Sequence, residues 1–475
     1  MGDISTSEMA KAVDVIIVGA GLSGLQAATD CHGAGLTTLV LEAKDRVGGK
    51  TCSVSNGRGG TVDVGAAWIN DTTQRRMFAL SQKFGIDVVM QRAVGEDIVQ
   101  NDDGTVEMVP YGEYRLTKDE TKELETFFEV IDGMGDKLDP EDPSTLANAA
   151  ELDSMTLTQY CNKYMPGKVA PLMANGTARG FLGVEADEIS ALFYIDYVRS
   201  GFRLESLTSD LKGGAQYLRA RQGWQTISKR LAADLPPSSV LLSTPVAAIH
   251  QSESGDCIVY SDSTKSTFRS KHVIISIPTP LYKHIEFYPA LPARKLAVTS
   301  STHLGHTSKM ILIYDAPWWR DVGLSGVLNS SIGPLAFSRD SSVEADNQYS
   351  LTCFLVGEPA RKWALLPLAD RKSTFLEHVK VMFAPVVAKT GKPVPAPVDT
   401  IEQIWAHEPW IWGCPCPVTA LGSLAEGAAK IRREAWGKIH FVGSETSVDY
   451  QGYMEGALSA GERGAAEVIA AVNTT

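Results

Sequence analysis

Long hydrophobic runs are missing from this sequence. No stretch reaches the roughly 18 consecutive apolar residues that a membrane-spanning helix needs. The opening segment MGDISTSEMAKAVD lacks the apolar core of a secretory signal, and the final Val-Asn-Thr-Thr is not a peroxisomal ending. We therefore expect a cytoplasmic protein that does not cross a membrane.

Metal ligands and cross-links are also scarce. The 475 residues include seven cysteines and nine histidines. The cysteines are odd in number and scattered, as is typical of reduced thiols, and none pairs with a histidine at zinc-ligand spacing. We predict neither a disulfide framework nor a metal centre, so any redox chemistry needs an organic cofactor.

Basic charge is in deficit. The formal net charge is −12 at pH 7, with acidic and basic residues interspersed. This balance disfavours a nucleic-acid groove or an anionic-membrane surface and favours a small or cationic partner. The length suggests two or three domains with a large core.

What the sequence does have is a glycine-rich turn near its start. The apolar run VDVIIV (13–18) leads into Gly19-Ala20-Gly21-Leu22-Ser23-Gly24, a small-residue helix follows, and TTLVLEA carries Glu42 and Ala43. The first glycine allows the turn, the second lets backbone approach a pyrophosphate, and the third lets helix and strand pack. The helix N-terminus favours the binding of phosphate. Glu42 lies where its carboxylate could accept hydrogen bonds from ribose hydroxyl groups. The unit predicts a dinucleotide site.

A second glycine turn follows at Asp45-Arg46-Val47-Gly48-Gly49-Lys50-Thr51, with a basic side chain able to reach the phosphates. NAD domains do not need it. Farther on comes Asp63-Val64-Gly65-Ala66-Ala67-Trp68-Ile69. With these motifs the sequence resembles the flavin monoamine oxidase family, in which both elements wrap FAD. The resemblance implies an α/β fold of two domains, a GxGxxG Rossmann-like FAD-binding domain and an α+β substrate domain, with cofactor contacts at Ser23, Ala43, Gly49, Lys50, Ala66, Ala67 and Trp68.

The resemblance recurs along nearly the whole chain and is most specific at residues 441–469. It is also carried by Gly213-Gly214-Ala215-Gln216, Thr244-Pro245-Val246, Ile277-Pro278 and Trp318-Trp319. It implies that Val246 contacts adenine through its main chain and that Ser444 and Glu445 line the flavin and phosphate path. Met454 would give a backbone contact where a helix begins, and a helix N-terminus there would stabilise the anionic reduced flavin.

Two residues are expected near the reacting atoms. Lys309 lies on an apolar strand, where an ammonium needs a partner or a lowered pKa. The resemblance implies that it holds a water beside flavin N5 and assists reoxidation; an exposed lysine on an edge strand is the alternative. Tyr453 matches one wall of the family's aromatic cage.

The second wall of that cage is absent, because Pro415 follows Cys414 where mammalian-type enzymes have tyrosine. The site is therefore wider on that side, or Trp410 or Trp412 fills it. Gln216 is a further substrate-binding candidate by the same resemblance.

Cys414 occupies the position of the family cysteine that becomes attached to the flavin 8α-methyl group. Several fungal-type relatives carry alanine there and hold FAD without a bond. The residue type favours an 8α-S-cysteinyl bond, whereas the Trp-Gly-Cys-Pro-Cys-Pro context could displace the sulfur from the alignment that attack needs. A buried, unreactive thiol is the alternative.

The pattern of elements predicts a discontinuous organisation. Strands are expected at 239–250, at 272–278 and from 309 to Pro317, a hairpin at 253–271, and helices near 115–135, near 180–200 and from 454. We expect an FAD-binding domain built from 1–80, 209–295 and 397–475, and a substrate-binding domain built from 81–208 and 296–396.

The resemblance implies oxidative deamination of a primary amine. A hydride equivalent passes to the flavin, oxygen takes the electrons to give hydrogen peroxide, and the imine hydrolyses to a carbonyl product and ammonia. The wider cage favours a bulky or long-chain amine of the fumonisin or sphingoid type. A homodimer stays open.

Other functions also stay open. One is a polyamine oxidase, for which Glu185, Asp187 and Glu188 are candidate tunnel acids. The others are a carbon–carbon desaturase and a flavin-bound binding module without turnover.

Overall fold

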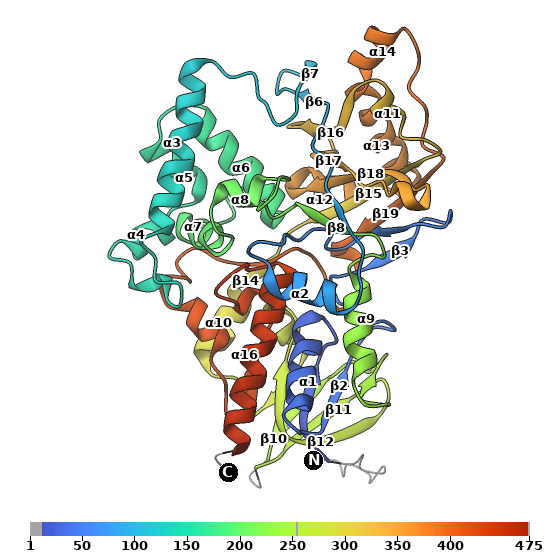
Figure 1. Ribbon diagram of the computed structural model, residues 1–475. Helices are drawn as coiled ribbons and strands as arrows, with labels where there is room; N and C mark the ends of the chain where they lie inside the picture. Colours follow the sequence, from blue (N-terminus) through green and yellow to red (C-terminus); the bar gives the residue numbers. More distant parts are fainter. Residues whose placement is uncertain (1–11, 253–254, 474–475) are drawn as a thin grey trace.

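The computed structural model describes residues 12–252 and 255–473. An eight-stranded sheet with its helices forms the lower part of the molecule in Figure 1, a seven-stranded sheet lies at the upper right, and a group of helices lies at the upper left. Within the described residues, no helix is long and apolar enough to cross a membrane.

The eight-stranded sheet carries the N-terminal glycine turn. Its strands run in the order β13-β10-β11-β12-β1-β2-β9, with β21 paired to β12. Their bounds are β1 (Val13–Val18), β2 (Thr38–Leu41), β9 (Val240–Leu241), β10 (Ala248–Gln251), β11 (Cys257–Ser261), β12 (Ser266–Ile275), β13 (Glu286–Tyr288) and β21 (Ile439–Phe441). β1 pairs in parallel with β2 and β12, and β12 with β21, so these four strands end at one edge. The apolar side chains of β1 are buried, as expected for a parallel strand covered on both faces.

Two helices from opposite ends of the chain pack together on this sheet (Figure 1). They are α1 (Leu22–Gly33) and α16 (Met454–Asn473), with α9 (Gln225–Asp234) and α2 (Arg75–Lys83) beside them. A Cβ on Gly461 of α16 would lie 2.4 Å from the carbonyl oxygen of Ser23, so the close approach of the helices requires glycine there. Leu25 and Leu458 belong to the shared hydrophobic core.

The seven-stranded sheet runs in the order β19-β15-β18-β17-β16-β6-β7. The bounds are β6 (Glu96–Gln100), β7 (Val106–Pro110), β15 (Thr307–Tyr314), β16 (Leu324–Ser330), β17 (Phe337–Asp340), β18 (Tyr349–Val356) and β19 (Asp399–Ile404). Trp319 and Phe375 are buried in its core. The helices of this region are α11 (Trp318–Asp321), α12 (Gly357–Ala364), α13 (Leu368–Met382) and α14 (Ala384–Thr390).

The helical group at the upper left of Figure 1 has its own core. It contains α3 (Lys118–Gly135), η1 (Pro143–Thr145), α4 (Ala149–Ser154), α5 (Leu157–Tyr164), α6 (Val169–Leu182), α7 (Ala191–Ser200) and α8 (Leu204–Thr208). Capping boxes at Thr117 and Thr156 set where α3 and α5 begin, because each hydroxyl accepts from a first-turn N–H. α7 is buried nearly all round, so it forms the centre of the group.

Short elements connect these parts. The paired strands are β3 (Ser53–Ser55) with β4 (Thr61–Asp63), β5 (Val88–Met90) with β8 (Leu218–Ala220), and β14 (Thr302–Leu304) with β20 (Pro417–Thr419). The remaining helices are η2 (Thr279–His284), α10 (Ala293–Ser301), η3 (Glu344–Asp346), η4 (Trp405–His407), α15 (Ala428–Arg433) and η5 (Ser444–Thr446).

Most of the expected elements are present, and two of them are divided. The strand expected at 239–250 is two strands, β9 and β10, because Pro245 has no N–H for a sheet ladder. The expected helix near 180–200 likewise ends at Leu182 and begins again at Ala191. The hairpin is confirmed as β11 and β12, although residues 253 and 254 lie outside the described part.

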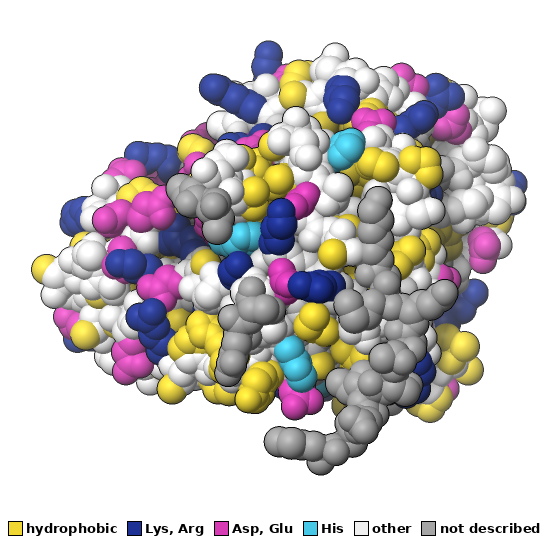
Figure 2. All heavy atoms as spheres, turned by 90° about the horizontal axis from the view of Figure 1, so that it is seen from below, with side chains coloured by type: hydrophobic (Ala, Val, Ile, Leu, Met, Phe, Trp, Pro, Cys, Tyr) yellow, Lys and Arg dark blue, Asp and Glu magenta, His cyan; other side chains and the backbone are white. Residues whose placement is uncertain are grey.

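The face seen from below shows no gathering of one charge. In Figure 2 acidic and basic side chains lie interspersed on it, among apolar and polar ones. This pattern of the described residues agrees with the mixed charge of the sequence.

Candidate cofactor and active site

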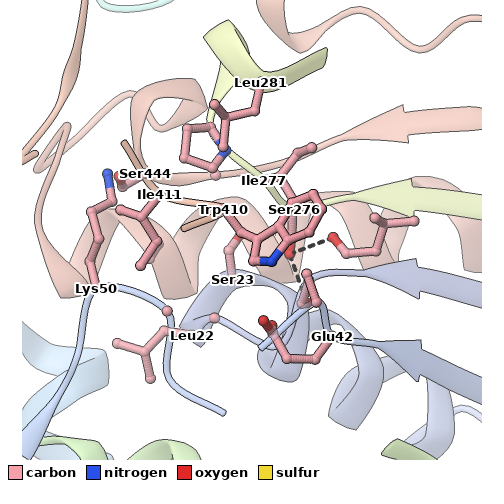
Figure 3. A pocket seen from close by; sticks show the side chains of 18 of the residues that line it. Leu22, Ser23, Glu42, Lys50, Ser276, Ile277, Leu281, Trp410, Ile411 and Ser444 are labelled. Carbon is pink, nitrogen blue, oxygen red and sulfur yellow. Dashed lines mark hydrogen bonds between the residues drawn. The ribbon is translucent and has the colours of Figure 1, made fainter. Parts of the chain in front are cut away.

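A cavity lies at the carboxyl edge of the eight-stranded sheet. It encloses about 1250 Å³, including its open mouth. Figure 3 shows its walls coming from segments far apart in the chain. Ligands of open α/β sheets bind at such an edge. The cavity brings together many of the residues expected at the cofactor or substrate, namely Gly19, Gly21, Ser23, Glu42, Ala43, Gly49, Lys50, Ala66, Val246, Trp412, Ser444, Glu445, Tyr453 and Met454.

The first glycine turn brings the N-terminus of α1 to this cavity. Gly19 has a φ of 101°, and a Cβ on Gly24 would lie 2.1 Å from the carbonyl oxygen of Gly19, so both positions require glycine. A Cβ on Gly21 would meet nothing within 4 Å. The hydroxyl of Ser23 is buried in the described structure without a hydrogen-bond partner. An open cradle, a helix N-terminus and an unpaired hydroxyl fit a phosphate group.

Glu42 directly follows β2 at the cavity wall. Its carboxylate accepts hydrogen bonds from the backbone N–H of Ala20 at 2.6 Å and of Lys44 at 2.8 Å. Burial raises the pKa of the carboxyl group. The two backbone donors fix the carboxylate and leave lone pairs for a further donor such as a hydroxyl group.

The second glycine turn lies against the first. The N–H of Gly48 donates to the carbonyl of Ala20 at 2.8 Å. Lys50 lines the cavity, but its Nζ donates to the carbonyl of Pro415 at 2.6 Å. The lysine expected at the phosphates is therefore tied to the segment that follows Cys414.

The C-terminal helix also begins at the cavity. Gly452, with a φ of 81°, Tyr453 and Met454 line the wall where α16 starts. The N-terminal end of this 20-residue helix carries a partial positive charge. Glu455 is engaged elsewhere, since it accepts from the backbone N–H of Met77 at 2.9 Å.

Lys309 lies behind the segment that contains Ala66. Its Nζ donates to the carbonyls of Asp63 at 3.0 Å and of Gly65 at 2.5 Å. It also lies 4.8 Å from the ring centroid of Phe354. Burial lowers the pKa of Lys309 to about 8, against the opposing charge of Asp63. The alternative of an exposed edge lysine is wrong, because β15 lies between β18 and β19 and Lys309 is only 3% exposed.

Tyr453 stands at the end of an aromatic group. Its ring centroid lies 5.5 Å from that of Tyr450 in an edge arrangement and 6.4 Å from that of Tyr197. Burial raises the pKa of its phenol, so the hydroxyl stays neutral.

Trp412 lines the same cavity as Tyr453 and packs against other rings of its wall. Its ring packs edge-on against His284 at 4.5 Å and lies 6.3 Å from the ring of Trp410, and 40% of the residue is exposed. Figure 3 shows Trp410 beside Ser276 and near Glu42. Trp410 therefore lies toward the Glu42 part of the cavity, and a role of Trp412 as the second wall stays a prediction.

The thiol of Cys414 is buried and is not part of the cavity lining. Its Sγ lies 3.9 Å from the carbonyl oxygen of Thr307, and burial raises the pKa of the thiol to about 11. A protonated thiol directed at a carbonyl is a poor nucleophile. Of the two alternatives for this cysteine, the geometry favours the unreactive thiol.

Gly24, which packs against the carbonyl of Gly19, and three other expected residues lie outside the cavity lining. The carbonyl of Ala67 accepts from the indole N–H of Trp224 at 3.0 Å, and the indole N–H of Trp68 donates to Gln91 at 2.9 Å. Gln216 donates from Nε2 to a backbone carbonyl at 2.9 Å, and its Oε1 is buried without a hydrogen-bond partner in the described structure. These side chains support the walls, and their placement does not make them direct contacts of a ligand in the cavity.

Some lining residues were not assigned to the cofactor from the sequence. Ser276, Ile277 and Pro278 follow the carboxyl end of β12, and Ile411 covers the cavity from a distant loop together with Trp410, which was considered only as a wall of the cage. Parallel pairing of β12 with β1 could have indicated the first group, because carboxyl ends of parallel strands meet at one edge. No local pattern marks the second group.

No cluster of three or more His, Cys, Asp or Glu side chains that could hold a metal ion occurs within residues 12–252 and 255–473.

Comparison with known proteins gives a consistent result. The family model described as "Flavin containing amine oxidoreductase" matches residues 22–469. The chain is 30% identical over 464 residues to a probable flavin-containing monoamine oxidase A of Dictyostelium discoideum, covering 97% of this chain and 98% of that protein. It is 29% identical over 469 residues to human flavin-containing amine oxidase B, covering 98% of this chain and 87% of that protein.

Solved structures agree over almost the whole chain. A putrescine oxidase bound to putrescine superimposes with a TM-score of 0.88 at 27% identity, covering 97% of this chain and 99% of the other. A cyclohexylamine oxidase from Brevibacterium oxydans gives a TM-score of 0.87 at 28% identity, covering 98% and 100% of the two chains.

Proposed function

The chain belongs to the flavin-containing amine oxidoreductase family, and from this premise we propose that it deaminates a bulky or long-chain primary amine and passes the electrons to oxygen. The chain is an FAD-dependent amine oxidase. The proposed reaction converts the amine to an imine and oxygen to hydrogen peroxide. Water then converts the imine to a carbonyl product and ammonia.

The observation that carries this proposal is one continuous cavity bordered by the N-termini of two helices. At α1 the cavity has the unpaired hydroxyl of Ser23 and the open side of Gly21, which suit the pyrophosphate of FAD. At α16 it has Tyr453 and Met454. FAD bound along it would accept a hydride equivalent from the α-carbon of the amine.

The chain's own residues position the reacting groups. The ring of Tyr453 would border the amine, and its neutral phenol adds no charge there. The Nζ of Lys309 gives two of its N–H groups to carbonyls, which leaves a third for a water molecule. Met454 would direct its backbone N–H to the pyrimidine end of the flavin.

The absence of a second aromatic wall supports a large substrate. Pro415 has no aromatic side chain at the position of the expected second wall, and the ring of Trp412 packs against His284. The acids considered for a polyamine tunnel already have partners. Glu185 is paired with Arg179 at 2.8 Å, and Glu188 with Arg361 at 3.0 Å. The similarity to a putrescine oxidase nevertheless keeps diamines as the second candidate.

A panel of amines tests the substrate. We expect long-chain or bulky primary amines to release hydrogen peroxide at kcat/KM values at least about tenfold above those of benzylamine and putrescine, because a difference of several buried methylenes exceeds 1.4 kcal/mol. Peroxide and ammonia would be measured in the same samples and should be equimolar. Faster turnover of benzylamine would contradict the large-substrate proposal, and peroxide from diamines alone would establish the second candidate.

Acid precipitation tests the attachment of the cofactor. Since Cys414 keeps its proton and contacts a carbonyl, we expect the flavin to stay in solution when the protein is precipitated with acid. The Cys414→Ala variant should bind FAD as the parent chain does. Yellow flavin retained in the parent pellet and lost from the Cys414→Ala pellet would establish the covalent bond instead.

We keep a cytoplasmic location and a homodimer as predictions. Gel filtration of the purified protein against its mass of 51.2 kDa would test the second.

A further inference from the structure

A short segment between β19 and β20 covers part of the cofactor cavity. We call residues 408–413 the strap. Trp410, Ile411 and Trp412 of the strap line the cavity, and Trp410 and Trp412 are 43% and 40% exposed. One side of the strap therefore faces solvent while the other forms a wall of the cavity.

The strap is anchored to the turn that follows Glu42. The ammonium of Lys44 forms an ion pair with the carboxylate of Glu408, and the amide of Gln403 donates to the same carboxylate at 2.9 Å. The backbone N–H of Trp412 donates to the carbonyl of Glu408 at 3.0 Å, which folds the strap into a tight turn. Glu408 thus joins the strap to the part of the cavity that Glu42 defines.

Trp410 lies on the inner side of this turn. Figure 3 shows its indole beside Ser276 and above Glu42, and the same cavity end is lined by Val246 and Ile277. Its backbone has a φ of 67°, a conformation that non-glycine residues rarely adopt. Contacts with residues distant in the sequence therefore hold the aromatic ring of Trp410 over the apolar end of the cavity.

The position of Glu42 identifies what that end would bind. A carboxylate at the end of the second strand of a dinucleotide unit accepts from ribose hydroxyls, so the adenosine half of FAD belongs there. We propose that Trp410 stacks on the adenine of FAD and that the strap, held by the Lys44 to Glu408 ion pair, must open before the cofactor can leave. No residue of the strap contributes to the chemistry of the amine in this proposal.

The proposal separates FAD from FMN. FMN has the same isoalloxazine and one phosphate but lacks adenosine, so it has nothing for Trp410 to contact. Stacking of a base on an aromatic side chain is a strong contact, and its loss typically lowers affinity by about tenfold or more. A change at Trp410 should therefore weaken the binding of FAD and leave that of FMN as it was.

The test measures flavin binding directly. Holoprotein variants are made in a Cys414→Ala background, so that release is measurable whether or not a thioether forms in the parent. The release of FAD is followed by flavin fluorescence after dilution, and the affinities of the stripped proteins for FAD and FMN are measured by titration. We expect Trp410→Ala to raise the release rate of FAD by about tenfold or more, and Trp410→Phe to recover most of the loss.

Two further variants complete the test. Glu408→Gln should accelerate release and reduce its dependence on salt, because the ion pair is lost. Tyr164→Ala, which removes an exposed aromatic of α5 far along the chain, should leave release unchanged. Unchanged FAD release in Trp410→Ala, or an equal loss of FAD and FMN affinity, would overturn the proposal. Either result would show that Trp410 does not contact the adenine of FAD.

Discussion

Replacing Gly24 by alanine should destabilise the fold around the cofactor cavity. A Cβ there would lie 2.1 Å from the carbonyl oxygen of Gly19 and 2.5 Å from Oγ of Ser276. Since the first of these is backbone, α1 would have to move away from β1 and β12. We expect a loss of stability of about 3 kcal/mol, at the upper end for overpacking, with loss of bound FAD. Thermal unfolding and the flavin content of the purified variant measure both effects.

Two glycines of the same helix region provide matched controls. A Cβ on Gly33, the last residue of α1, would meet nothing within 4 Å, so Gly33→Ala should be neutral or slightly stabilising. Gly21→Ala also meets no protein atom, but its methyl group would enter the cavity. It should preserve the stability of the FAD-free chain and weaken FAD binding. Normal stability of Gly24→Ala would show that the two strands and α1 have more room than the structure gives them.

Lys309→Met should slow the reaction of the reduced enzyme with oxygen by about 100-fold, a typical effect of removing a positioned proton donor. The ammonium is held by the carbonyls of Asp63 and Gly65, beside the cavity segment that contains Ala66. Methionine keeps the length of the side chain but has neither the charge nor an N–H donor. Anaerobically reduced enzyme mixed with oxygen in a stopped-flow instrument gives the rate, and reduction by the amine should change much less.

Lys295→Met is the control for this variant. Lys295 is also buried, its Nζ also donates to two carbonyls, those of Ile431 and Arg432, and burial lowers its pKa to about 7. It does not line the cavity. Lys295→Met should therefore alter stability without altering reoxidation. Equal effects of the two variants on reoxidation would show that the loss of any buried lysine slows the reaction, and that the position of Lys309 has no special role.

The lowered pKa of Lys309 predicts how the rate of reoxidation depends on pH. Because the pKa of Lys309 is lowered to about 8, the group is charged below that pH and neutral above it. Any help that its charge gives to reoxidation should decline as the pH rises through about 8, and Lys309→Met should lack this step. The unfolded chain still binds the proton up to its ordinary pKa of about 10.4, so this group makes folding more favourable as the pH rises between the two values.

The sequence predicted those parts of the site that depend on local pattern. The turn from Gly19 to Gly24 and the buried strand before it are specified by neighbouring residues, and the structure places them at the cavity as expected. Tyr453 and Met454 were identified from a similar local block. By contrast, no local pattern indicated that the ring of Trp412 packs against His284.

The contacts that the sequence did not predict have one physical cause in common. The position of the strap depends on an ion pair between Lys44 and Glu408, which are far apart in the chain and have no local signature. The direction of Cys414 likewise depends on the carbonyl of Thr307 in another strand. The charge of Lys309 was judged correctly as needing a partner or a lowered pKa, but its two carbonyl partners could not be read from β15 alone. Contacts across long sequence separations are set by the whole fold.

The packing of α1 against α16 has a consequence for how the protein is made. During synthesis the glycine turn and β1 leave the ribosome long before the helix that completes the cavity. Until then the nascent chain presents the apolar side of α1, including Leu25, without its final covering. Capture of the flavin must therefore follow translation of α16, and a ribosome that stalls before Met454 would release a colourless, aggregation-prone product rather than a weaker enzyme.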